Sequence, residues 1–184
     1  MLSAESICPF SILELLVDDF FTYIHPLAPF PHEPSFRAAF KQREDLSNPS
    51  FLALLASMIG MLVASFPRKP IMHLKAQHQE KLFPNSISLV ERCHKVAVEA
   101  RGAGYLDRDL TVYDAVTSYF LGLAGAYTIN WHQCRLYFGE TFTISRAVGV
   151  QRANENAKMG DNKVDFIKQE IGRRMFWVMV VGVR

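Results

Sequence analysis

The stretch that most constrains the fold of this chain is residues 16–36, where a proline-rich segment separates two helix patterns. An amphipathic helix pattern leads into the first proline. Residues 34–36 then open a second helix, because proline fixes φ and is tolerated in a first helical turn. The prolines in between keep the backbone extended without a sheet partner. We therefore predict a rigid corner, from which Leu27, Phe30 and Phe36 insert between helices.

The rest of the sequence carries helix patterns, with no convincing alternating strand and no internal repeat. Residues 51–66 are apolar nearly all round, which places that helix in the centre of a bundle. Residues 71–83 have weaker periodicity. The sequence predicts an all-α bundle of about seven helices. The expected helices cover residues 10–24, 35–44, 51–66, 87–100 and 131–148, with others starting at Thr111 and near Asp165.

Local signals mark several helix starts and one close contact. Side chains that accept hydrogen bonds from a first helical turn stand before three of the helices. They are Asn48 or Ser47, Thr111 with Asp114 in an approximate capping box, and Asn130. Small residues four apart, Ser118, Gly122 and Ala126, predict that a neighbouring helix approaches the helix that carries them.

Composition favours a packed globular domain over a disordered tail, since 49% of the 184 residues are hydrophobic and 21% are charged. The net charge is +2 and the lysines and arginines are scattered, so DNA binding by this segment is not expected. Cys8, Cys93 and Cys134 lie far apart, which fits reduced intracellular thiols. The start of the sequence shows no secretory signal pattern.

Enzyme and metal sites find little support in the sequence. Asp18 and Asp19 are adjacent, but successive helical residues point about 100° apart, so a solvated helix face is the favoured interpretation. His132 lies two residues from Cys134, on another side of the helix. No histidine or cysteine pair has a zinc-ligand spacing. We expect no enzyme, no catalytic residue and no metal ligand; an unrecognised helical enzyme would need a clustered site in a cleft, which a sequence does not display.

Three blocks in order carry a family resemblance. The first is an apolar helix ending in His25-Pro26, followed by a proline-rich run that ends in Pro34-Ser35-Phe36. The second is residues 127–131, where Trp131 opens a helix, followed by residues 145–152 at the end of that helix. The third is residues 170–177, with Arg173, Arg174 and Trp177. Together they resemble the regulatory middle region of fungal zinc-cluster transcription factors, the xylanolytic-activator regulatory domain.

The resemblance implies transcription control in the nucleus by a helical domain that responds to a small-molecule inducer and pairs with another transcription factor copy or a regulatory protein. It implies no cofactor in this chain. Zinc is expected only in a DNA-binding module with six closely spaced cysteines, which this sequence lacks, so DNA would be reached only through that module. Residues 1–184 are then part of a single, incomplete regulatory domain.

The pair of arginines and the aromatic residues in and near these blocks are candidate site residues. Arg173 and Arg174 point about 100° apart, so at most one faces the core, and a structural contact with carboxylates or helix carbonyls is favoured over a ligand or nucleic-acid contact. We also hypothesise that a small metabolite binds among helices near Tyr119, Trp131 and Trp177.

Two alternatives remain open. One is a truncated interaction module that pairs with full-length factors and competes with them. The other is a helical membrane protein that uses residues 49–67 and 111–129. The first of these runs has about 17 residues between its prolines, which is at the bottom of the range that spans a bilayer, so a buried core helix and no membrane contact are favoured.

Overall fold

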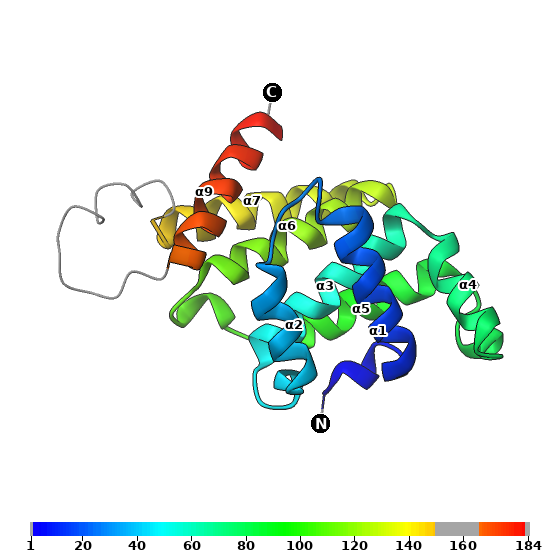
Figure 1. Ribbon diagram of the computed structural model, residues 1–184. Coiled ribbons are helices and arrows are strands. Elements are labelled where there is room, and N and C mark those ends of the chain that lie inside the picture. Colours follow the sequence, from blue (N-terminus) through cyan, green and yellow to red (C-terminus); the bar gives the residue numbers. More distant parts are fainter. Residues whose placement is uncertain (1, 150–165, 183–184) are drawn as a thin grey trace.

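A computed structural model describes residues 2–149 and 166–182 of the protein (Figure 1). These residues form eight α-helices, short helical turns and no strand, which confirms the all-α prediction. The helices are α1 (Phe10–Asp19), α2 (Glu33–Lys41), α3 (Pro49–Ser65), α4 (Arg68–Ala76), α5 (Ser86–Arg101), α6 (Val112–Tyr127), α7 (Trp131–Ala147) and α9 (Phe166–Gly182).

Helix α3 lies at the centre of the bundle, as its apolar sequence predicted. Every residue from position 51 to position 63 is buried. Helices α1, α5 and α6 pack against it, α7 packs against α6, and α9 contacts both α6 and α7 (Figure 1). Gly60 allows α3 and α5 to approach closely, because a Cβ atom added there would lie 3.2 Å from the Cβ of Cys93.

Helix α4 overlaps residues 71–83, whose helix periodicity in the sequence is weak. Arg68 is its first residue and Pro70 lies in its first turn, where backbone N–H groups have no partner within the helix. This proline therefore costs no helical hydrogen bond, and the helix ends at Ala76.

The predicted corner is present between α1 and α2. A π-helix, Phe20–Ile24, continues α1, and α2 begins at Glu33 with Pro34 in its first turn. Phe30 is fully buried, with ring centroids 5.6 Å from those of both Tyr119 and Phe120.

One part of the corner prediction is wrong. Leu27 is 81% exposed, whereas Phe36 is buried as expected. The Leu27 N–H donates to the Ile24 carbonyl at 2.9 Å in a turn after the π-helix, and that turn directs Ala28 to the core in place of Leu27.

The predicted caps are confirmed. The Asn48 side chain accepts hydrogen bonds from the Ser50 and Phe51 N–H groups, at 3.0 and 3.2 Å. The carboxylate of Asp114 accepts from the Thr111 N–H at 2.9 Å to complete a capping box, and the side chain of Asn130 accepts from the Gln133 N–H at 3.1 Å. Each bond satisfies a donor that a helix start leaves without a partner.

Among the described residues, no single helix is both long and apolar enough to cross a membrane. Helices α3 and α4 together reach the required length and composition, but they meet at a bend of 102°.

The small residues of α6 do allow a close approach, and the neighbour is α7. A Cβ atom at Gly122 would lie 3.1 Å from the Phe138 ring, and one at Gly125 would lie 2.9 Å from the backbone nitrogen of Cys134. A backbone atom cannot move aside as the end of a flexible side chain can, so Gly125 is the tighter of the two positions.

We predict opposite effects for alanine at two helical glycines. Gly125→Ala should lower the free energy of unfolding by roughly 1–3 kcal/mol, because the new methyl group overpacks the contact between α6 and α7. Gly139→Ala in α7 meets open space and should raise it by about 0.5–1 kcal/mol through helix propensity. Urea unfolding followed by circular dichroism measures both. Equal effects of the two substitutions would contradict the packing described here.

Candidate functional site

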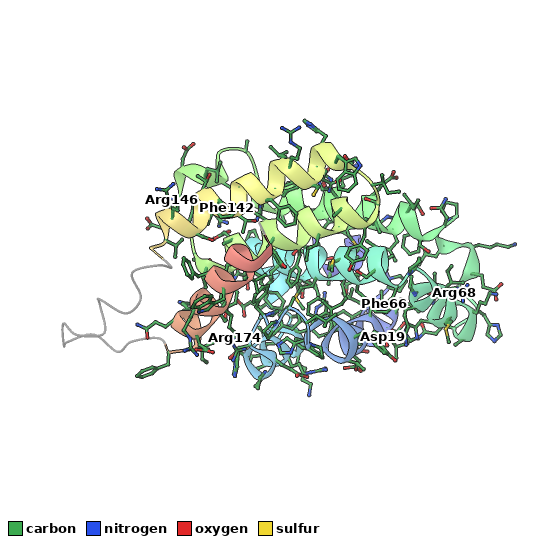
Figure 2. All side chains as sticks on the ribbon, turned by 90° about the horizontal axis from the view of Figure 1, so that it is seen from above. Asp19, Phe66, Arg68, Phe142, Arg146 and Arg174 are labelled. Carbon is green, nitrogen blue, oxygen red and sulfur yellow. The ribbon has the colours of Figure 1, made fainter. Side chains whose placement is uncertain are left out.

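Arg174 ties α9 to the corner. Figure 2 shows where Arg174 lies on the bundle. On one side its Nε donates to Glu170 Oε1 at 2.9 Å, within α9. On the other its Nη1 donates to the backbone carbonyl of Pro29 at 3.1 Å, across 145 positions of sequence. The first and last blocks of the family resemblance therefore meet in space.

Arg173 uses the same carboxylate without reaching the corner. Its Nη2 lies 2.7 Å from Glu170 Oε2, and its side chain is 63% exposed. The hydrogen bond from Arg174 and the charge of Arg173 lower the pKa of Glu170. Within residues 2–149 and 166–182, Arg174 is the one of the two arginines that contacts another element, and its partners are a carboxylate and a loop carbonyl.

A pocket of about 480 Å³ opens beside this contact. It lies between α2, the first turns of α3 and α6, and the first turn of α9. Its volume is in the range of small-molecule sites. Apolar and aromatic side chains make up much of its wall, with polar groups among them. The lining residues are Pro31, Ser35, Phe36, Ala39, Glu44, Asn48, Ser50, Phe51, Leu54, Thr111, Tyr113 and Lys168.

Hydrogen bonds hold the polar part of this wall in place. Glu44 Oε1 accepts from the Asn48 amide at 2.6 Å, and Ser50 Oγ accepts from Arg108 at 2.7 Å. Arg108 also binds Asp114 at 2.7 Å, which connects the start of α3 to the start of α6. The pocket is thus built from two capped helix starts whose relative position is fixed by one arginine.

Comparison with known families identifies the chain. The model of the "Fungal specific transcription factor domain" family matches residues 17–181. The chain belongs to this family. It is a family of transcription factors, non-enzymatic and typically nuclear, and the match does not extend to a zinc cluster. No curated protein and no solved structure gave a match.

In this fungal transcription factor domain, the three aromatic residues that we expected at a metabolite site, Tyr119, Trp131 and Trp177, lie outside the pocket. Tyr119 is half-buried, 5.9 Å from the Phe138 ring between centroids, and burial raises the pKa of its hydroxyl. Trp131 and Trp177 are 62% and 59% exposed, because each lies on the outward side of its helix. None of the three lines the pocket. A metabolite site at these residues stays a prediction, without support from their burial.

The other signature residues of the fungal transcription factor domain have structural surroundings. Phe36 lies in the pocket wall and packs on Phe51, with ring centroids 5.1 Å apart. Pro34 is exposed in the first turn of α2. Pattern reasoning found both residues but not the pocket, which needs α2, α3, α6 and α9 to be placed together.

A buried ion pair that the sequence did not reveal joins α5, α6 and α7. Arg101, whose side chain is 2% exposed, lies 2.7 Å from Glu140 Oε1. Its other terminal nitrogen donates to the Asp114 carbonyl and to Ser118 Oγ, both at 2.8 Å. Arg101 precedes Gly102 at the end of α5 and reads in sequence as an ordinary cation at a helix end.

Asp18 is exposed to solvent as the sequence predicted, but Asp19 is not. Asp18 is 63% exposed and binds Arg37 at 2.6 Å. The side chain of Asp19 is 14% exposed and lies 2.7 Å from His73 Nε2 and 3.5 Å from Lys69 Nζ, so it joins the end of α1 to α4. The two carboxylates therefore bind different partners, on different elements.

The part of the chain that the structure describes holds no group of three histidine, cysteine or acidic side chains placed to bind a metal ion. Its three cysteines are buried free thiols, and burial raises the pKa of Cys8 to about 12. A thiol with so high a pKa stays protonated and is a poor nucleophile.

Replacing the two neighbouring arginines should separate their roles. Arg174→Met removes the bond to the Pro29 carbonyl and should lower the free energy of unfolding by about 1 kcal/mol, a value reduced by the partial exposure of the side chain. Arg173→Met should change it by less than about 0.5 kcal/mol. Exchange of the backbone amide hydrogens of α9 should also be faster in Arg174→Met, and should be unchanged in Arg173→Met. Similar exchange in the two variants would exclude a role of the corner contact in holding α9.

Removal of the carboxylate from the buried ion pair of Arg101 and Glu140 should lower the free energy of unfolding far more than removal of one from an exposed pair. Glu140→Ala leaves the Arg101 guanidinium buried without its carboxylate and should cost roughly 3–5 kcal/mol of unfolding free energy. The matched control is Glu99→Ala, which removes an exposed pair with Lys95 at 3.8 Å and should cost less than about 0.5 kcal/mol. Denaturant unfolding tests both; a small loss for Glu140→Ala would mean that water reaches Arg101.

Proposed function

We propose that this chain is the regulatory domain through which a fungal zinc-cluster transcription factor responds to a small-molecule inducer, with DNA binding supplied by a separate module. The pocket of about 480 Å³ carries the proposal. Its volume suits a small organic molecule, and its wall combines an apolar body with a few fixed polar groups, as ligand sites do. Among the described residues, no other pocket combines a volume of this size with a wall that contains a signature residue, here Phe36.

The position of the pocket gives a route from ligand to response. Pro31 of the corner and Lys168 of α9 both lie in its wall. The same two elements are joined by the hydrogen bond from Arg174 to the Pro29 carbonyl. A ligand that binds better when the corner and α9 are together shifts the protein toward the docked arrangement of α9. The proposed response is this shift.

The charges around the pocket favour a small, mostly apolar organic acid. The first turns of α3 and α6 face it with the positive ends of their helix dipoles. Glu44 is the carboxylate in the wall, and it accepts a hydrogen bond from Asn48. Phe36, Phe51 and Leu54 would contact the apolar body of such a ligand.

Pairing with another copy of the factor or with a regulatory protein is a second proposal, and the exposed side chains of α9 favour it. Phe166 is 79% exposed and Trp177 is 59% exposed. The end of α9 also projects beyond the other helices (Figure 1). Exposed aromatic side chains are frequent anchors of protein interfaces. For both proposals we also propose a nuclear location, as is typical of the family.

The ligand proposal is tested with a blocked pocket and a matched control. Ala39 lines the pocket and Ala38 next to it is exposed, so Ala39→Phe fills the hollow whereas Ala38→Phe adds the same ring outside it. The probes are small aromatic and aliphatic carboxylates together with their primary amides.

At about 100 times its dissociation constant, a binding carboxylate should stabilise the native protein and Ala38→Phe by about 2.7 kcal/mol, seen as a rise in Tm of several degrees. Ala39→Phe should show no rise, and the amides should bind more weakly. Differential scanning fluorimetry gives the Tm. Failure of every probe, or equal responses of the two phenylalanine variants, would reject the pocket as the inducer site.

A further inference from the structure

We propose that the outward face of α7 binds an acidic amphipathic helix of a partner protein. This α7 face consists of Trp131, Arg135, Gly139, Phe142 and Arg146, with Leu136 at its edge. Four of these residues, at positions 135, 139, 142 and 146, follow one another at steps of four and three, so they form one line along the helix. The face is separate from the pocket and does not depend on a ligand there.

The α7 face is apolar and open to solvent. Trp131, Leu136 and Phe142 are 62%, 54% and 39% exposed. In both views α7 lies at the edge of the bundle (Figures 1 and 2). Figure 2 shows Phe142 and Arg146 at the same end of it. Gly139 lies in the middle of the line, and a Cβ atom built there meets nothing. A partner helix could therefore approach the backbone of α7 closely at this position.

The charges on this face have one sign. Arg135 and Arg146 make no ion pair or side-chain hydrogen bond with any described residue. The single acidic residue of α7 is Glu140, and the buried Arg101 holds it on the other side of the helix. Exposed apolar side chains between two unpaired guanidinium groups match a partner that alternates carboxylates with apolar residues.

Charge also decides against two other occupants. A second copy of the α7 face would bring arginines against arginines, and like charges facing each other oppose association. Nucleic acid would need more cations than two arginines, and the whole chain carries a net charge of only +2. An acidic helix satisfies the arginines and covers the apolar side chains at once.

The spacing of the arginines defines the probe. Arg135 and Arg146 are separated by three helical turns, about 16 Å along the axis. A peptide of about 18 residues with glutamates at that separation and leucines at helical spacing between them fits both features, and its length lets it form a helix. The control peptide has glutamine at each glutamate position. Each peptide carries fluorescein, and binding to the full chain is measured by fluorescence anisotropy.

The glutamate peptide should bind the native chain at least about tenfold more tightly than the glutamine peptide. The double variant Arg135→Glu with Arg146→Glu should lose this binding, and Gly139→Leu should weaken it without changing any charge. The matched control, Lys41→Glu with Arg68→Glu, alters net charge equally at exposed sites on other helices and should bind like the native chain.

Three outcomes would overturn the proposal. They are equal binding of the two peptides, unchanged binding by the Arg135→Glu and Arg146→Glu double variant, and equal weakening by the Lys41→Glu and Arg68→Glu control. Sedimentation of the chain alone adds a fourth: self-association that Gly139→Leu abolishes would assign the α7 face to a second copy. Circular dichroism of each variant confirms that it is folded before binding is scored.

Discussion

Burial of α3 on all sides is the constraint on which the rest of this bundle depends. A helix without a polar face needs neighbours all round it, and each fully buried apolar side chain contributes about 1.5–3 kcal/mol. Helices α1, α5 and α6 provide those neighbours. Helices α4, α7 and α9 are then outer elements with an exposed side. These outer sides are where partners and signals have access to the domain.

Polar contacts fix the arrangement that apolar burial alone leaves adjustable. Apolar surfaces are non-directional, so helices packed only by them have several acceptable rotations and shifts. Arg101 requires the Asp114 carbonyl, Ser118 and Glu140 to be in place together, and these groups come from α6 and α7. A buried guanidinium in the wrong place would be costly, so this network selects one register of three helices.

The sequence predicted features with local causes and missed those that join distant segments. Helix starts at Asn48, Thr111 and Asn130 follow from residues within one turn, and each prediction was confirmed. Contacts between Arg101 and Glu140, 39 positions apart, and between Asp19 and His73, 54 positions apart, have no local pattern. The pocket was missed for the same reason, because four helices must be placed before their side chains enclose a space.

The meeting of the corner with α9 explains why the family pattern is spread along the chain and how the domain could respond to a ligand. Undocking α9 would expose Ile171 and Met175, which are 2% and 0% exposed, and would break the Arg174 bond to the Pro29 carbonyl. The two side chains together contribute about 3–6 kcal/mol. A ligand at saturating concentration changes an equilibrium by about 3–4 kcal/mol. The free energy of docking α9 and that of ligand binding are therefore of similar size, as the proposed control of α9 by a small molecule requires.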